Sequence, residues 1–173
     1  MSLHFFNYIY VNKKTMQTGL LHLHNLLRWI ILILLVLSIY KSYIGMSSKK
    51  PFEASDKKIW LFTMIAGHIT LLLGLYQWLL GRYGLLSYVK AEDAASANID
   101  SAYLRFFQME HPISMILAIL LITLGHGMAK KNVDDAVKYK KAFRYFLLAL
   151  VLIIVAVPWP YRVLVGRPLF PGM

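Results

Sequence analysis

Four strongly apolar stretches, separated by short polar segments, dominate the pattern of this chain. They lie at residues 20–40, 59–80, 108–129 and 143–158. These lengths approach the roughly 20 residues that a helix needs to cross the hydrocarbon core of a bilayer. The last stretch ends at Pro158 and Pro160, which cannot continue a helix. The pattern predicts an all-α integral membrane protein with a four-helix up-and-down bundle in a lipid bilayer.

Composition and length support a single membrane domain. Hydrophobic residues make up 58% of the chain and charged residues 16%, outside the range of ordinary soluble domains. With 173 residues and four spans, no room remains for a separate soluble domain. Residues 1–15 resemble neither a signal peptide nor a span, because an aromatic run precedes Lys13 and Lys14. We therefore interpret residues 1–15 as a leader or interfacial segment and residues 16–173 as the transmembrane domain.

The formal net charge of +11 is explained by membrane orientation rather than by nucleic-acid binding. Eleven Lys and Arg residues lie between Lys41 and Lys58 and between Lys130 and Arg144, whereas the segments on the opposite side hold seven. Positively charged loops face the cytoplasm, so we expect both termini on the outer face. Nucleic acid is not expected as a partner.

Histidines in the apolar stretches are the strongest functional signal. An ionisable side chain in hydrocarbon costs free energy unless it has a partner, and imidazole readily ligates haem iron and transition metals. His24, His68 and His111 are the candidate ligands, and the alternative is a hydrogen bond that joins two helices. His126, close to Lys130, is expected to extend toward water, and His4 and His22 to be interfacial or exposed.

Depth favours one pair of these histidines. With a rise of about 1.5 Å per residue, His24 lies about one turn inside the outer surface of the first helix. His111 begins the third helix on the same side, so the two could approach one iron from opposite faces. His68 lies near the middle of the second helix and remains an alternative, because helix tilt or a kink at Pro112 can shift depth by a turn. The sequence leaves open whether the protein holds one haem or two.

Arginines reinforce the outer end of the predicted bundle. Arg28 lies one turn below His24 on the same helical face, and a buried arginine needs an anion, either Glu110 or a haem propionate. Arg162 at the end of the fourth helix and Arg105 before the third could bind propionates or another anionic group. For Trp159 and Tyr161 beside Arg162, ordinary interfacial anchoring is the preferred interpretation.

The absence of cysteine removes several redox chemistries. The chain can form no disulfide, no thiolate-ligated haem and no covalent CxxCH haem attachment. Met64, Met109 and Met115 are interpreted first as packing residues, with copper binding as the alternative.

Four short motifs in this chain are similar to motifs of a known group of proteins. They are His22-Leu23-His24-Asn25-Leu26-Leu27-Arg28-Trp29, Gly67-His68 followed by Gly74, Glu110-His111-Pro112, and Pro158-Trp159-Pro160-Tyr161-Arg162. From Met16 onward the chain resembles small four-helix bacterial membrane proteins labelled cytochrome b, with a weaker likeness to four-helix membrane protoporphyrinogen oxidases. The resemblance implies haem b, a role in membrane electron transfer, and a multi-pass protein of the bacterial inner (cytoplasmic) membrane.

These observations predict a membrane b-type cytochrome that carries single electrons through a bis-histidine haem. Such an iron has no open coordination position, which favours electron transfer over catalysis, and no catalytic residue is assigned. The electron partner would be a quinone or a larger respiratory complex. Two alternatives are a membrane oxidoreductase acting on a quinone or porphyrin and a metal-handling or structural accessory subunit.

Overall fold

The computed structural model describes residues 3–81, 84–86 and 101–170, with side chains from Thr15 onward. The described chain is helical and contains no strand. Its elements follow in the order α1 (Leu3–Ser47), α2 (Ala54–Leu80), α4 (Ser101–Arg105), the π-helix η1 (Phe106–Glu110), α5 (His111–Gly127), the 3₁₀ turn η2 (Met128–Lys130) and α6 (Asp135–Ala156).

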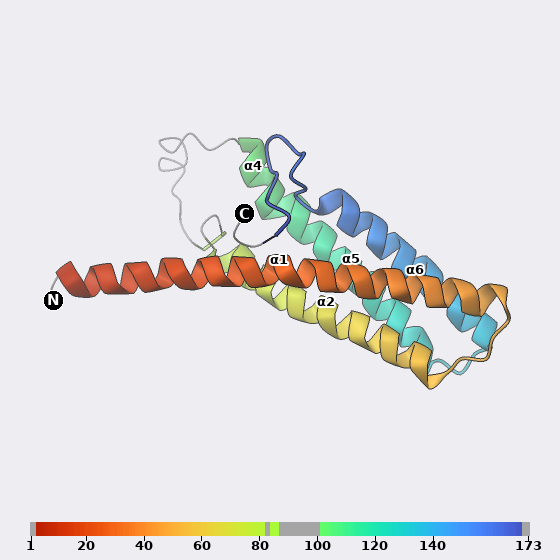
Figure 1. The fold of residues 1–173 in the computed structure, drawn as a ribbon. Helices are drawn as coiled ribbons and strands as arrows, with labels where there is room; N and C mark the ends of the chain where they lie inside the picture. The colour runs from red at the N-terminus through yellow and green to blue at the C-terminus, as the bar shows by residue number, and fades with distance from the viewer. Residues whose placement is uncertain (1–2, 82–83, 87–100, 171–173) are drawn as a thin grey trace.

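The four long helices form a bundle in which consecutive helices are neighbours (Figure 1). Helix α1 packs against α2 and α6, and α5 packs against the same two helices. Helices α1 and α5 therefore lie diagonally across the bundle. The expected four-helix arrangement is confirmed, and the N-terminal part of α1 extends past the end of the bundle where α6 ends (Figure 1).

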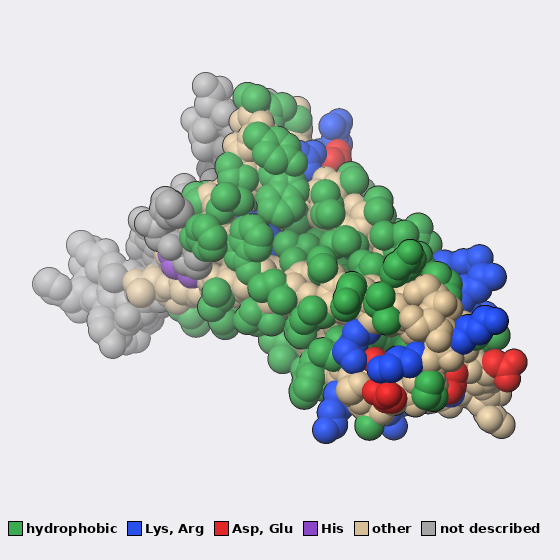
Figure 2. Space-filling view, turned by 45° about the vertical axis from the view of Figure 1, so that its right-hand side comes forward, with side chains coloured by type: hydrophobic (Ala, Val, Ile, Leu, Met, Phe, Trp, Pro, Cys, Tyr) green, Lys and Arg blue, Asp and Glu red, His purple; other side chains and the backbone are tan. Residues whose placement is uncertain are grey.

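Three described helical segments are long and apolar enough to cross a membrane: Thr15–Ser47, Ala54–Leu80 and Ser101–Lys130. Helix α6 differs because Lys140, Lys141 and Arg144 lie in its first half. Hydrophobic side chains cover most of the visible bundle surface, and Lys and Arg gather at the end that holds the α1–α2 and α5–α6 connections (Figure 2). These features support a membrane protein, while the side on which the termini lie stays a prediction.

The helices are longer than the predicted apolar stretches. Polar residues at their ends can also be helical, because a helix pairs its backbone N–H and C=O groups whatever the side chains are. Helix α1 runs through residue 16 without a break, so the expected leader continues the first helix within the described residues. Helix α2 starts five residues early, where the backbone N–H of Glu53 donates to the Asp56 carboxylate. Helix α6 ends at Ala156, just before Pro158, as the sequence predicts.

Close helix packing depends on glycines that face large side chains. A Cβ added at Gly125 would lie 2.6 Å from the ring of Phe146, and one added at Gly67 would lie 2.9 Å from Ile119. Small residues let helix backbones approach in membrane bundles, where no aqueous hydrophobic effect drives association. Phe146 is fully buried together with Trp60 and Tyr139, and their rings meet edge to face.

The π-helix precedes the residue that begins α5. The backbone N–H of His111 donates to the carbonyl of Phe106, five residues earlier, rather than four. Pro112 has no N–H, so the carbonyl of Gln108 loses its usual α-helical donor. The indole Nε1 of Trp78 in α2 donates to that carbonyl at 2.8 Å. This contact joins α2 to the irregular turn that positions His111.

Candidate functional site

The histidine pair expected from depth is brought together. The ring centroids of His24 on α1 and His111 on α5 are 6.5 Å apart, and their planes are inclined by 73°. The two imidazoles therefore meet edge to face, although they come from the diagonal helices α1 and α5. They lie in the half of the bundle where α6 ends.

The tautomer of His111 follows from its hydrogen bond. Its Nδ1 lies 2.8 Å from the carbonyl oxygen of Ala156, the last residue of α6. A carbonyl only accepts, so Nδ1 carries the proton and donates, which leaves a lone pair on Nε2. A backbone acceptor on Nδ1 is the usual device that orients a metal-ligating histidine. Phe106 and Phe107 flank the ring, with centroids 5.9 and 6.5 Å away.

His24 lies against a glycine of the neighbouring helix. A Cβ at Gly74 in α2 would lie 3.2 Å from Cε1 of His24 and 3.8 Å from Nδ1. Glycine therefore provides the space that the imidazole uses. Nδ1 of His24 is buried and has no hydrogen-bond partner among the described residues. A buried polar atom without a partner costs free energy, so Nδ1 is left unsatisfied, whereas the ring also forms a hydrogen bond with the backbone of Thr70 in α2.

The centroid separation of the pair is close to the value for two imidazoles that share one metal ion. Metal–nitrogen bonds to histidine are about 2.0–2.1 Å and the ligating nitrogen is about 1.2 Å from the ring centre, so trans imidazoles have centroids about 6.4 Å apart. The described residues contain no group of three or more His, Cys, Asp or Glu side chains that could hold a metal ion. A bare ion would find two protein ligands, whereas a porphyrin supplies four nitrogens and needs only axial ligands. The donor set thus fits haem.

His68 is not brought to this pair. Its side chain lies on an exposed face of α2, and Nδ1 bonds the carbonyl of Met64 in its own helix at 2.8 Å. His126 is buried at the opposite end of the bundle, in contrast to its expected extension toward water, because Gly125 allows close packing of α5 on α6. His22 is partly buried, and the side chain of His4 lies outside the described residues.

Arg28 is buried, as expected, but its partner is not Glu110. Its guanidinium donates to the carbonyl of Leu169 at 2.7 Å, while Glu110 pairs with Arg105 at 2.8 Å. The Nε of Arg28 is buried and has no hydrogen-bond partner among the described residues. The residues that follow α6 therefore return across α1 one turn from His24. The sequence contains no local signal for this long-range contact.

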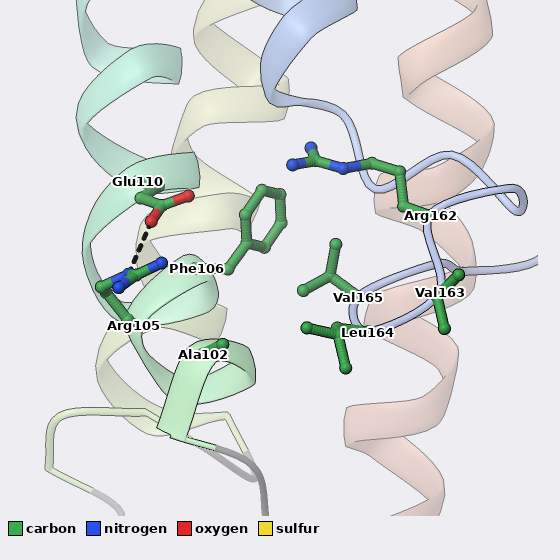
Figure 3. Close-up of a pocket in the computed structure, with 8 residues that line it drawn as sticks. All are labelled: Ala102, Arg105, Phe106, Glu110, Arg162, Val163, Leu164 and Val165. Atoms are coloured by element: carbon green, nitrogen blue, oxygen red, sulfur yellow. Dashed lines mark hydrogen bonds and ion pairs between the residues drawn. The ribbon is translucent and has the colours of Figure 1, made fainter.

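Arg162 lies in a pocket beside the pair rather than between the two histidines. Its guanidinium lies over the ring of Phe106, 4.7 Å from the centroid, and donates to the carbonyl of Val155 at 3.1 Å. The pocket has a volume of about 330 Å³ (Figure 3). Its lining combines one carboxylate, two guanidiniums and apolar side chains: Ala102, Arg105, Phe106, Glu110, Arg162, Val163, Leu164 and Val165.

The expected packing role of two methionines agrees with their positions. Met64 and Met115 pack against the buried core, whereas Met109 is exposed. Residues that the sequence did not single out include Phe106, which separates the pocket from His111, and Trp78, which holds the π-helix. Aromatic residues are frequent in every span, so no sequence signal distinguished these two.

Comparisons of the chain with protein-family models, curated proteins and solved structures found no match. The functional argument therefore rests on the residues of this chain.

Proposed function

We propose that this protein is a membrane b-type cytochrome that carries single electrons. His24 and His111 would hold one noncovalent haem b between α1 and α5. The observation that carries the proposal is their 6.5 Å centroid separation across the bundle. The cofactor supplies an iron that alternates between the ferric and ferrous states.

The roles of the protein residues follow from their contacts. Ala156 accepts the Nδ1 proton of His111 and keeps the Nε2 lone pair available. Gly74 leaves room for the ring of His24. The free Nε of buried Arg28 is the donor available to a propionate one turn from His24. Two histidines would hold the haem and leave the iron no position for a substrate, so we propose electron transfer rather than catalysis.

The cellular setting follows from the same proposal. We place the protein in the bacterial inner membrane, with a quinone or a larger respiratory complex as its electron partner. The metal-handling alternative is less well supported, since the described residues contain no group of three metal-ligating side chains of the kinds that hold an ion.

A reduced-minus-oxidised optical spectrum of the detergent-purified protein, with pyridine haemochrome quantification, tests this function. We expect a b-type spectrum in the wild type, loss of it in His24→Ala and His111→Ala, and its retention in His68→Ala. His68→Ala is the matched control, because this substitution also removes an imidazole from an apolar helix, but one that lies on an exposed face. Wild-type protein without haem after haem-replete expression would refute the proposal, and loss of haem only in His68→Ala would reject the ligand assignment.

A further inference from the structure

The residues that follow α6 form a compact loop with its own hydrogen bonds. We call residues 157–170 the strap. The backbone N–H of Arg167 donates to the carbonyl of Pro158 at 3.0 Å, and that of Gly166 donates to the carbonyl of Arg162 at 2.7 Å. Carbonyl groups of the same loop lie so close to Gly166 that a Cβ there would come within 2.9 Å of three of them. Because these contacts are internal, the strap can move as one unit about the end of α6.

The strap joins the two parts of the chain that carry the histidine pair. On one side the guanidinium of Arg167 lies over the ring of Phe107, 5.2 Å from its centroid. On the other side the indole Nε1 of Trp29 in α1 donates to the carbonyl of Leu169 at 2.9 Å. Figure 1 shows the strap running from the end of α6, beside α4, toward α1. The strap therefore connects α1 to the turn that precedes His111.

An aromatic contact holds the strap against α1. The ring of Trp29 stacks on that of Phe170, with centroids 5.6 Å apart and planes inclined by 19°. It also meets the ring of Trp159 at 6.3 Å. Phe170 is exposed, so the bundle core does not depend on this stack. Segments held by few contacts near the surface are the ones that open at low free-energy cost.

Near the histidine pair, the other sides of the bundle are joined directly from helix to helix. The side chain of Gln77 in α2 donates to the carbonyl of Leu20 in α1 at 3.0 Å. Trp78 joins α2 to the π-helix η1, and His111 joins α5 to α6. On the fourth side, between α1 and α6, the strap makes the connection. A molecule as large as a porphyrin thus meets hydrogen bonds between helices on three sides and the strap on the fourth.

We propose that the strap is a gate through which haem enters and leaves the site between His24 and His111, an inference that rests on the proposed electron-carrier function. In the closed state, the stack on Trp29 and the hydrogen bond to Leu169 hold the strap across the side between α1 and α6. Release of these contacts moves the strap outward about the end of α6 and opens that side. Because the bundle core stays packed, opening changes the rates of haem entry and exit and leaves the histidines in place.

Haem exchange in the detergent-purified protein tests the gate. Trp29→Leu removes the stack and the indole donor, and Phe170→Ala removes the stack from the side of the strap. Weaker closure raises the population of the open state, so haem uptake by the apoprotein and haem transfer to apomyoglobin should both become about tenfold faster. The b-type spectrum should be retained. Tyr43→Leu is the matched control, because Tyr43 in α1 also contacts a ring of α6, that of Phe143 at 6.0 Å, but near the α1–α2 connection.

A second measurement follows the strap without haem. The chain contains no cysteine, so Val165→Cys provides a single thiol at a strap position that is 6% exposed. Its rate of maleimide labelling reports the opening of the strap, and adding Trp29→Leu should raise this rate about tenfold. Ile153→Cys is the control, because this position in α6 is 3% exposed and lies outside the strap, and its labelling should stay unchanged.

The outcomes separate this inference from the proposed function. Wild-type protein without haem refutes the electron carrier and the gate with it. Haem-loaded protein in which Trp29→Leu and Phe170→Ala leave uptake and release unchanged overturns the gate alone. Faster release without faster uptake would show that the strap contributes to haem affinity and does not control access, which also overturns the inference. Equal acceleration of labelling at Val165→Cys and Ile153→Cys would assign the effect to the whole bundle and overturn it as well.

Discussion

Replacement of Gly74 by alanine should weaken haem binding without destabilising the bundle. The new Cβ would lie 3.2 Å from Cε1 of His24, closer than the 3.4–4 Å of ordinary contacts, so the imidazole must move by a few tenths of an ångström. Metal–ligand distances in protein sites hold to within about 0.2 Å. The displacement exceeds this tolerance, and altered support of a ligand typically costs about tenfold or more in affinity. We expect about tenfold weaker haem binding, equivalent to about 1.4 kcal/mol.

Gly19→Ala is the control for this experiment. Gly19 also lies within a helix, but a Cβ there would meet nothing within 4 Å. Alanine is favoured over glycine in a helix by about 1 kcal/mol, so neither variant should unfold more easily than the wild type. The assay titrates haem into the apoprotein in detergent and follows the absorption bands, with helical content measured during thermal unfolding. Equal haem affinity in Gly74→Ala and Gly19→Ala would refute the steric reasoning.

Two further predictions concern the end of the bundle that holds the lysine-rich connections. Tyr139→Phe should lower the free energy of unfolding by about 1.5–3 kcal/mol, because the buried Asp56 carboxylate loses a 2.6 Å hydrogen bond. Chemical denaturation in detergent measures this free energy of unfolding. An equal loss in Tyr40→Phe, at an exposed site, would show that the loss does not come from the hydrogen bond to Asp56. The hydrogen bond from Lys138, together with that from the Phe52 N–H, holds the pKa of Asp135 below its ordinary value of 3.8. Its stabilising contribution should therefore be present above pH 3.8 and disappear as the pH falls through the lower folded-state pKa. Asp135→Asn should show a smaller loss of thermal stability on acidification, and an unchanged pH dependence would contradict this role.

The membrane character of the protein and the positions of its helices along the chain could be predicted from the sequence. Apolar runs of near-bilayer length leave helices as the spanning structure, because backbone groups in hydrocarbon must bond within their own segment. Pro158 determined the end of the last helix, since proline cannot continue the backbone ladder. A constant rise per residue also placed His24 and His111 at similar depth, and the two rings do lie close together.

The inward faces of the helices were decided by the tertiary structure. The spans are apolar on nearly every side, so periodicity did not distinguish buried positions from lipid-facing ones. His68 therefore remained an alternative ligand in the sequence, although it lies on an exposed face. The diagonal placement of α1 and α5, which opposes His24 and His111, depends on contacts between helices far apart in the chain.

The partners of the arginines also required the folded chain. Arg28 bonds the carbonyl of Leu169, 141 residues later, and no local pattern specifies such a contact. Pro112 indicated an irregular turn, but only its packing beside Trp78 shows how the Gln108 carbonyl obtains a donor. The sequence by itself determined that the helices form and that His24 and His111 lie toward the same end of the bundle, since both follow from local hydrophobicity and a constant rise. Only the tertiary structure decided which of these side chains meet, because that depends on the packing of surfaces that are equally apolar in the sequence.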